Sequence, residues 1–193
     1  EIENRDIISI NGHAIAYVAA GGILAPVTFL IDKSNDKKDA GTFSYIRYGA
    51  KKFFTDPELY KNIVNNPYNI TYNANEQTIN TSAVFFAIFN AKSFANLCID
   101  PHANMCNGKF NVVIIPNTIE LLKLLRQGIT PNHGITQSRH VFSTDSLTLT
   151  FNDTTPFYPL NCDGDAINLL EKSNVLDVKP SGKILQLIGK KRK

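Results

Sequence analysis

Two carboxylates flank one glycine near the end of the sequence, in the tripeptide Asp163-Gly164-Asp165. The tripeptide follows the apolar stretch 157–160, which predicts a strand that runs into a tight turn. A carboxylate held at such a turn can accept a proton from a substrate hydroxyl as a general base. Because Asp-Gly is also common in surface turns, a solvated turn acid is the alternative interpretation.

The rest of the sequence contains no motif that could complete an active site with these carboxylates. It has no glycine-rich phosphate-binding loop, no zinc-ligand spacing and no serine or cysteine nucleophile motif. The three cysteines have no CxxC spacing, which favours packing thiols in a reducing, intracellular environment. The sequence begins at Glu1, and its one methionine is Met105. We therefore expect the chain to be part of a longer protein and to carry part of an active site.

The composition favours a folded, soluble, cytoplasmic domain. Hydrophobic residues make up 43% of the 193 residues and charged residues 19%, which predicts one packed domain over residues 1–193. The net charge is only +3, and the basic residues are scattered apart from the tail 190–193, so we expect no nucleic-acid partner. No apolar run approaches the ~18 residues of a membrane-spanning helix.

Most of the chain has the pattern of β-strands. Asn11-Gly12 between the apolar segments 6–10 and 14–18 predicts a hairpin with a type I′ turn, and residues 68–72 and 77–81 predict a second hairpin around the turn 73–76. Residues 83–89 are apolar throughout and residues 110–115 are apolar except for Asn111, which indicates strands buried on both faces. Further strands are predicted at residues 27–31, 140–143, 146–151, 175–178 and 184–188, the last two joined by a turn at 180–182.

Two helices interrupt the strands. Residues 41–54 place Phe43, Ile46, Ala50 and Phe53 on one helical face. A second helix is expected after Asn117, with Glu120 completing a capping box, Gly128 as the C′ residue, and an apolar stripe of Leu121, Leu122, Leu124 and Leu125. Many strands with two interposed helices predict a mainly β fold with helical insertions, either a two-sheet β-sandwich or a distorted barrel.

Five short segments, in order along the chain, resemble the second domain of bacterial diacylglycerol kinase-like lipid kinases. Residues 15–22 (Ile-Ala-Tyr-Val-Ala-Ala-Gly-Gly) resemble the string aromatic-Ala-Tyr-Val-Ala-Ala/Ser-aromatic-Gly that opens that domain. The other matches are residues 41–51, the Asn-Gly-Lys-Phe-Asn-Val strand entry at 107–112, the leucine helix at 121–125, and the turn 163–165, which is similar to an Asp-Gly-Glu turn.

The resemblance implies that the chain is the C-terminal domain of a two-domain lipid kinase, whose N-terminal ATP-binding domain, with its Gly-Gly-Asp-Gly-Thr motif, is missing from this sequence. The parent protein would use ATP and Mg²⁺ to phosphorylate the hydroxyl of diacylglycerol or a related lipid, at the membrane surface as a peripheral protein. Asp165 would be the general base, with Asp163 and Gly164 supporting the turn, and the isolated chain would bind neither ATP nor Mg²⁺ tightly and would be inactive. The alternative is a non-catalytic β-sandwich module that binds a lipid, a sugar or a protein partner.

The chain departs from the family pattern at four positions. Asp165 stands where the family carries glutamate, and Asn107 stands where it carries an aspartate associated with bound magnesium, although a neutral amide is a poorer ligand for this hard cation. Gly21 and Pro26 replace an aromatic residue and an acid. The cluster of Phe85, Phe86 and Phe89 could line an acyl-chain cleft, but core packing is the favoured interpretation.

Overall fold

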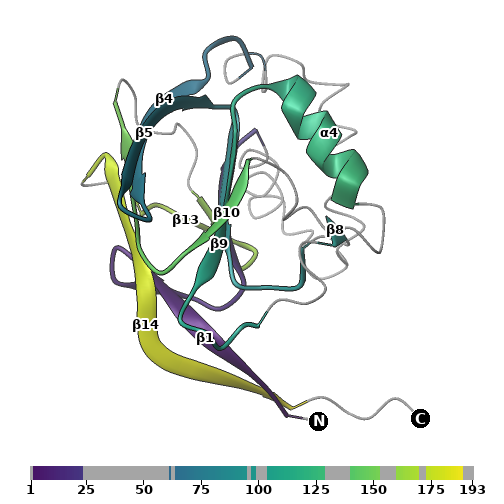
Figure 1. The fold of residues 1–193 in the computed structure, drawn as a ribbon, viewed down its shortest axis with the longest axis vertical. Helices are drawn as coiled ribbons and strands as arrows, with labels where there is room; N and C mark the ends of the chain where they lie inside the picture. Colours follow the sequence, from purple (N-terminus) through teal and green to yellow (C-terminus); the bar gives the residue numbers. More distant parts are fainter. Residues whose placement is uncertain are drawn as a thin grey trace.

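Two six-stranded antiparallel sheets form the fold (Figure 1). The computed structural model describes residues 2–23, 61, 64–94, 97–98, 104–128, 140–152, 160–169 and 173–188. The expected strand 27–31, the expected helix 41–54, Pro26 and the tail 190–193 lie outside these residues. Within the described part, no helix is long and apolar enough to cross a membrane.

The first sheet has the strand order β2-β1-β14-β11-β4-β5. Its strands are β1 (Ile2–Ile10), β2 (His13–Ile15), β4 (Tyr68–Ala74), β5 (Gln77–Ala83), β11 (Leu147–Phe151) and β14 (Val175–Ile188). Both predicted hairpins belong to this sheet. Asn11 and Gly12 join β1 to β2 with φ angles of 49° and 83°, as a type I′ turn requires, and Asn75 and Glu76 join β4 to β5 with φ angles of 49° and 62°.

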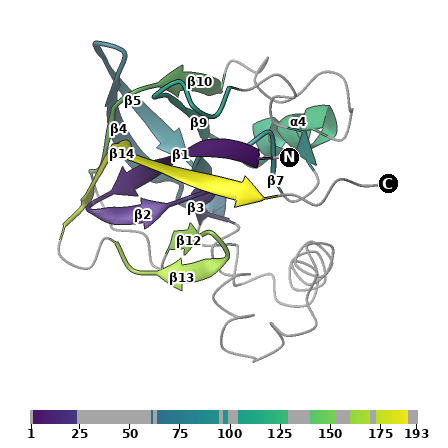
Figure 2. The ribbon, with the colours of Figure 1, turned by 90° about the horizontal axis from the view of Figure 1, so that it is seen from below.

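The second sheet has the strand order β10-β9-β6-β3-β12-β13. Its strands are β3 (Val18–Gly22), β6 (Phe85–Phe89), β9 (Phe110–Ile115), β10 (Val141–Thr144), β12 (Leu160–Cys162) and β13 (Asp165–Ile167). A separate two-stranded ribbon is formed by β7 (Ser93–Phe94) and β8 (Leu97–Cys98). Hairpin β12–β13 and strand β10 lie at opposite edges of the second sheet, as Figure 2 shows.

Strands β3, β6 and β9 of the second sheet are buried on both faces, as predicted for β6 and β9. Alternate side chains of these strands face the first sheet and form the main core with residues such as Ile70, Leu149 and Val178. The intervening side chains, including Phe85 and Phe89, form a second core on the outer face. The phenylalanine cluster therefore packs into the two cores, because Phe86 faces inward and its two neighbours in the cluster face outward.

Helix α4 (Thr118–Gly128) covers the outer core with Leu121 and Leu124. The amide oxygen of Asn117 caps the helix by accepting the backbone N–H of Glu120 at 3.0 Å, as predicted. Two details of the prediction are wrong. Leu122 is 66% exposed and does not belong to the buried stripe, and Gly128 lies within the helix and does not follow it.

Two predictions about strands and one about a cysteine need correction. Residues 14–18 do not form one strand, because the chain leaves the first sheet after Ile15 and enters the second at Val18. Residues 180–182 do not form a turn between two strands. They lie in the single strand β14, where a bulge shifts the register between the pairs Asp6–Ile184 and Ile8–Pro180 and Gly182 adopts a φ of 72°. Cys106 is exposed and therefore does not act as a packing residue.

Candidate active site at the Asp163-Gly164-Asp165 turn

The tripeptide forms the two-residue turn of hairpin β12–β13. Cys162 pairs with Asp165, and the intervening Asp163 and Gly164 have φ angles of 54° and 99°. Aspartate and glycine tolerate these positive angles better than other residues, so the local sequence specifies the turn. The amide oxygen of Asn161 accepts the backbone N–H of Gly164 at 3.0 Å and closes the turn.

The carboxylate of Asp163 holds this turn against the segment that connects the two sheets. Its Oδ2 accepts the backbone N–H of Ala16 at 2.7 Å, and its Oδ1 accepts those of Tyr17 and Val18, each at 2.8 Å. From the sequence, Asp163 is expected to support the turn by accepting backbone hydrogen bonds within it. The structure places these bonds instead on a segment about 145 residues away in sequence. Charge-assisted bonds of this kind are stronger than neutral ones, so Asp163 fixes the turn relative to the β2–β3 crossover.

Asp165 is the first residue of the edge strand β13, and it is exposed. Since Asp165 lies directly opposite Cys162, both side chains point to the face of the sheet that bears the main core. Burial raises the pKa of the Cys162 thiol to about 12, with smaller contributions from the negative charges of Asp163 and Asp165. One carboxylate of the turn is therefore committed to the backbone, while the other stands at the solvent-exposed rim.

Arg5 contacts the segment that binds this turn, and no sequence motif predicts a role for it. Its side chain is buried on β1, and its guanidinium carbon lies 4.4 Å from the centroid of the Tyr17 ring. Because the backbone of Tyr17 also donates to Asp163, this cation–π contact links β1 to the turn. An isolated arginine in a polar segment gives no sequence signal for such a contact.

Asn107 lies in a loop that is held by hydrogen bonds to backbone groups. Its amide oxygen accepts the N–H of Lys109 at 3.0 Å, and that of Asn104 accepts the N–H of Cys106 at 3.0 Å. Asp6 Oδ2, on strand β1, accepts the N–H of Gly108 at 2.8 Å. In the described residues, no three histidine, cysteine, aspartate or glutamate side chains gather as metal ligands. The loop offers only neutral amides beside the one carboxylate of Asp6, a donor set that does not fit Mg²⁺ well.

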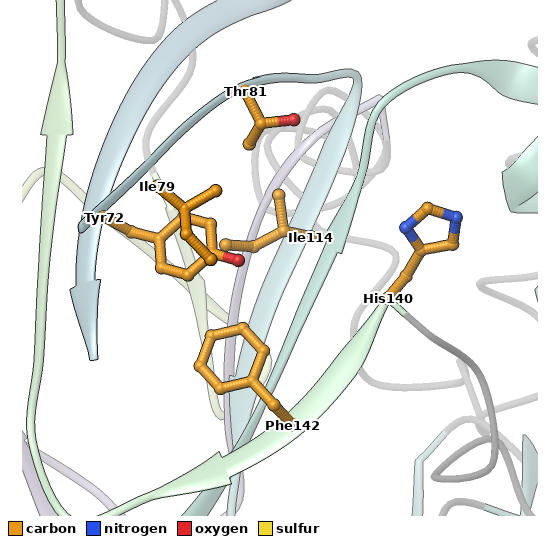
Figure 3. Close-up of a pocket in the computed structure, with 6 residues that line it drawn as sticks. All are labelled: Tyr72, Ile79, Thr81, Ile114, His140 and Phe142. Carbon is orange, nitrogen blue, oxygen red and sulfur yellow. The ribbon is translucent and has the colours of Figure 1, made fainter. Parts of the chain in front are cut away.

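A small cavity lies at the opposite edge of the fold, between β4–β5 and β9–β10 (Figure 3). The rings of Tyr72 and Phe142 stack at its wall with centroids 5.3 Å apart, and burial raises the pKa of Tyr72. His140, at the cavity rim, has its Nε2 atom 3.0 Å from Glu120 Oε2 and so connects β10 to helix α4. The cavity is remote from Asp165 because β10 and β13 are opposite edge strands of the same sheet.

Comparison with solved structures identifies the fold. The chain is similar to a crystal structure described as a putative diacylglycerol kinase from Bacillus anthracis str. Sterne, with a TM-score of 0.60, 15% sequence identity and 96% of this chain covered. A second structure, described as a diacylglycerol kinase from the same organism, gives a TM-score of 0.60, 12% identity and 95% coverage. The chain spans 56% of the length of each, in their C-terminal part. No family model matches the sequence, and neither does any curated protein.

Proposed function

We propose that this chain is the C-terminal domain of an ATP-dependent lipid kinase that phosphorylates the hydroxyl of diacylglycerol or a related lipid. Two independent lines support the proposal. The fold is that of the C-terminal part of proteins described as diacylglycerol kinases, and five sequence segments resemble the same family in the same order. Since a fold hosts many activities, the function must be argued from the site itself.

The observation that carries the proposal is the different use of the two turn carboxylates. Asp163 accepts three backbone N–H groups, which fix the turn against residues 16–18. The exposed Asp165 follows it after one glycine, at the start of an edge strand. A rigid turn that presents a carboxylate at a solvent-accessible rim is a suitable support for a general base, because positioning is a large part of what such a base contributes.

In the proposed reaction, Asp165 takes the proton of the lipid hydroxyl while that oxygen attacks the γ-phosphorus of ATP. The new oxygen–phosphorus bond forms as the bond between the γ-phosphorus and the bridging oxygen breaks, and ADP leaves. Phosphoryl transfer needs little covalent participation from the protein, so one positioned carboxylate is a sufficient contribution from this domain. The nucleotide and its Mg²⁺ would be held by the N-terminal domain of the parent protein, and the Asn107 loop has no metal in this scheme.

The proposal is tested by incubating the full-length protein that contains this chain with radiolabelled ATP, Mg²⁺ and diacylglycerol in detergent micelles. We expect label to appear in a phosphorylated lipid. The isolated chain of 193 residues is the matched control, and we expect it neither to bind ATP in calorimetry nor to transfer phosphate. If the full-length protein transfers no phosphate to any diacylglycerol or related lipid, the kinase proposal fails and a binding module becomes the better interpretation.

A further inference from the structure

Helix α4 exposes two large aliphatic side chains, although its other face is already buried. Ile119 is 65% and Leu122 is 66% exposed, which makes them the most exposed large hydrophobic residues in the described part of the chain. They are three residues apart and therefore lie one turn apart on the same side of the helix. The buried Leu121 and Leu124 point to the outer core of the second sheet, so the fold itself does not use Ile119 and Leu122.

The same face of the helix carries two cations. At about 100° per residue, Leu122, Lys123 and Arg126 all lie within about 60° of Ile119 around the helix axis. Lys123 and Arg126 are both exposed. The face of α4 formed by Ile119, Leu122, Lys123 and Arg126, here called the α4 outer face, thus combines two aliphatic groups with two positive charges.

The one acidic residue of α4, Glu120, pairs with one of these cations and with a residue outside the helix. Only 15% of the Glu120 side chain is exposed, and its two carboxylate oxygens contact Lys123 Nζ at 2.8 Å and His140 Nε2 at 3.0 Å. His140 is only 14% exposed, so it holds Glu120 toward the body of the domain. Glu120 therefore offsets the charge of Lys123, and the net positive charge of the α4 outer face is that of Arg126.

We infer that the α4 outer face docks the protein on a membrane whose surface carries anionic lipids. Aliphatic side chains that project between basic ones are the pattern of a helix lying in the bilayer interface, where the aliphatic groups enter the acyl region and the cations meet phosphate headgroups. The net positive charge of the face selects this partner, because an apolar protein interface would desolvate Arg126 and the Lys123–Glu120 ion pair. The inference deepens the proposed function, on which it rests only for the idea that the substrate is embedded in a bilayer.

The test is sedimentation of the chain with vesicles of phosphatidylcholine and phosphatidylglycerol, and with vesicles of phosphatidylcholine alone. We expect the partition coefficient to be higher for the anionic vesicles. The double variant Ile119→Ser/Leu122→Ser should reduce it by about tenfold or more, since each side chain loses most of its apolar transfer free energy. Ile184→Ser is the matched control, because Ile184 is 58% exposed on β14, which lies away from α4 in Figure 1, and we expect no change.

A second variant keeps the inference testable if the first is poorly folded. Lys123→Gln/Arg126→Gln should lower the partition into anionic vesicles by about tenfold and leave partition into neutral vesicles nearly unchanged, whereas Lys183→Gln on β14 should have no effect. The inference is overturned if the wild-type chain does not bind anionic vesicles, or if both α4 variants bind them like the wild type. It is also overturned if the aliphatic pair instead governs self-association in analytical ultracentrifugation without any vesicle binding.

Activity of the full-length protein separates this inference from the proposed function. The α4 variants should slow phosphorylation of long-chain diacylglycerol in vesicles while leaving that of a soluble short-chain diacylglycerol unchanged. If no lipid is phosphorylated but α4-dependent vesicle binding remains, the kinase proposal fails and the docking inference stands. If vesicle substrate is phosphorylated equally by wild type and variants, the docking inference fails and the kinase proposal stands.

Discussion

Val18 and Asp163 form two reciprocal hydrogen bonds. The backbone N–H of Asp163 donates to the carbonyl oxygen of Val18 at 2.8 Å, and the backbone N–H of Val18 donates to Asp163 Oδ1 at 2.8 Å. Val18 is the first residue of β3, where the chain enters the second sheet. The reciprocal pair therefore joins the candidate catalytic turn to the point at which the two sheets are connected.

Asp165→Asn in the full-length protein is expected to lower the turnover number for lipid phosphorylation by about 10²–10⁴-fold, because the amide keeps the size of the side chain but cannot accept the proton. ATP affinity and the thermal midpoint should be nearly unchanged. Asp165→Glu should retain activity or increase it, since it restores the residue found in the resembling family. Steady-state kinetics at saturating ATP is the measurement, and near-full activity of Asp165→Asn would show that another group is the base.

Asp163→Asn is expected to lower the free energy of unfolding by about 1 kcal/mol, because the variant loses the charge and replaces one of the two accepting oxygens by an NH2 group, which cannot accept a backbone N–H. Asparagine still tolerates the φ of 54° at this position, so the backbone itself is not strained. Urea unfolding with an unchanged m-value measures the loss. Asp145→Asn is a control at another exposed aspartate, and an equal loss there would contradict the specific role of Asp163.

Gly21→Ala is expected to destabilise the chain because of the Phe86 ring. A Cβ atom at position 21 would lie 2.3 Å from Phe86 Cζ and 2.9 Å from Leu160 Cδ2. In this chain, the ring of Phe86 therefore fills space beside a position where the resembling family carries an aromatic residue. We expect a loss of about 1–3 kcal/mol, as in other overpacked cores.

Phe86→Leu should recover part of the stability lost by Gly21→Ala, since it removes the ring atoms nearest to the new methyl group. The matched variant Gly22→Ala should not be rescued, because its Cβ would meet the backbone oxygen of Val84 at 2.3 Å and its φ is +88°. A double-mutant cycle by chemical denaturation measures the coupling. If the effects of Gly21→Ala and Phe86→Leu on the free energy of unfolding are additive, the Phe86 ring is not what excludes a side chain at position 21.

The buried thiol of Cys162 makes stability depend on pH under alkaline conditions. Burial raises its pKa from the ordinary value of 9.0 to about 12. Below pH 9 the thiol is protonated in the folded and the unfolded chain, so it does not affect stability. Between pH 9 and 12 only the unfolded chain loses the proton, and the free energy of unfolding falls with a slope of up to about 1.4 kcal/mol per pH unit.

Cys162→Ala should remove this contribution, so the difference in unfolding free energy between wild type and variant should narrow as the pH rises from 9 to 12. Urea titrations of both proteins across this range measure the difference. Lysines and tyrosines titrate in both proteins, so their contribution to the free energy of unfolding cancels in it. Thiol labelling of the folded protein offers a second measurement, in which exposed Cys106 should react much faster than Cys162. If the free energies of unfolding of the two proteins change in parallel with pH, the pKa of Cys162 is not raised as stated.

Magnesium is expected to leave the thermal midpoint of the isolated chain unchanged at millimolar concentration, because the amide oxygens of Asn104 and Asn107 accept backbone N–H groups and carry no charge. Asn107→Asp gives this loop a carboxylate in addition to that of Asp6, which binds the loop from strand β1, and the midpoint of the variant should rise with magnesium if the family site can be restored. Calorimetric melting with magnesium or EDTA tests both proteins. A magnesium-dependent rise in the wild type would contradict the prediction.

The sequence by itself determined the local elements. Positive φ angles at Asn11-Gly12 and at Asp163-Gly164 follow from the residue types, and so do the mainly apolar strands at 85–89 and 110–115 and the cap at Asn117. The sequence also contains the five segments that resemble diacylglycerol kinase-like proteins, and the comparisons with solved structures confirm the fold that this resemblance implies. These features depend on neighbours in the chain, through backbone sterics and side-chain periodicity, so a single sequence is enough to predict them.

Only the tertiary structure decided how distant segments meet. The three N–H groups that hold Asp163 come from residues 16–18, and the partners of Glu120 include His140, but no local pattern encodes either contact. The bulge in β14 arises because that strand pairs with β1 along its length, which overrides the turn signal of Pro180-Ser181-Gly182. The exposure of Leu122 was likewise decided by where α4 rests on the second sheet, because helix periodicity places leucines on a face without saying which face is covered.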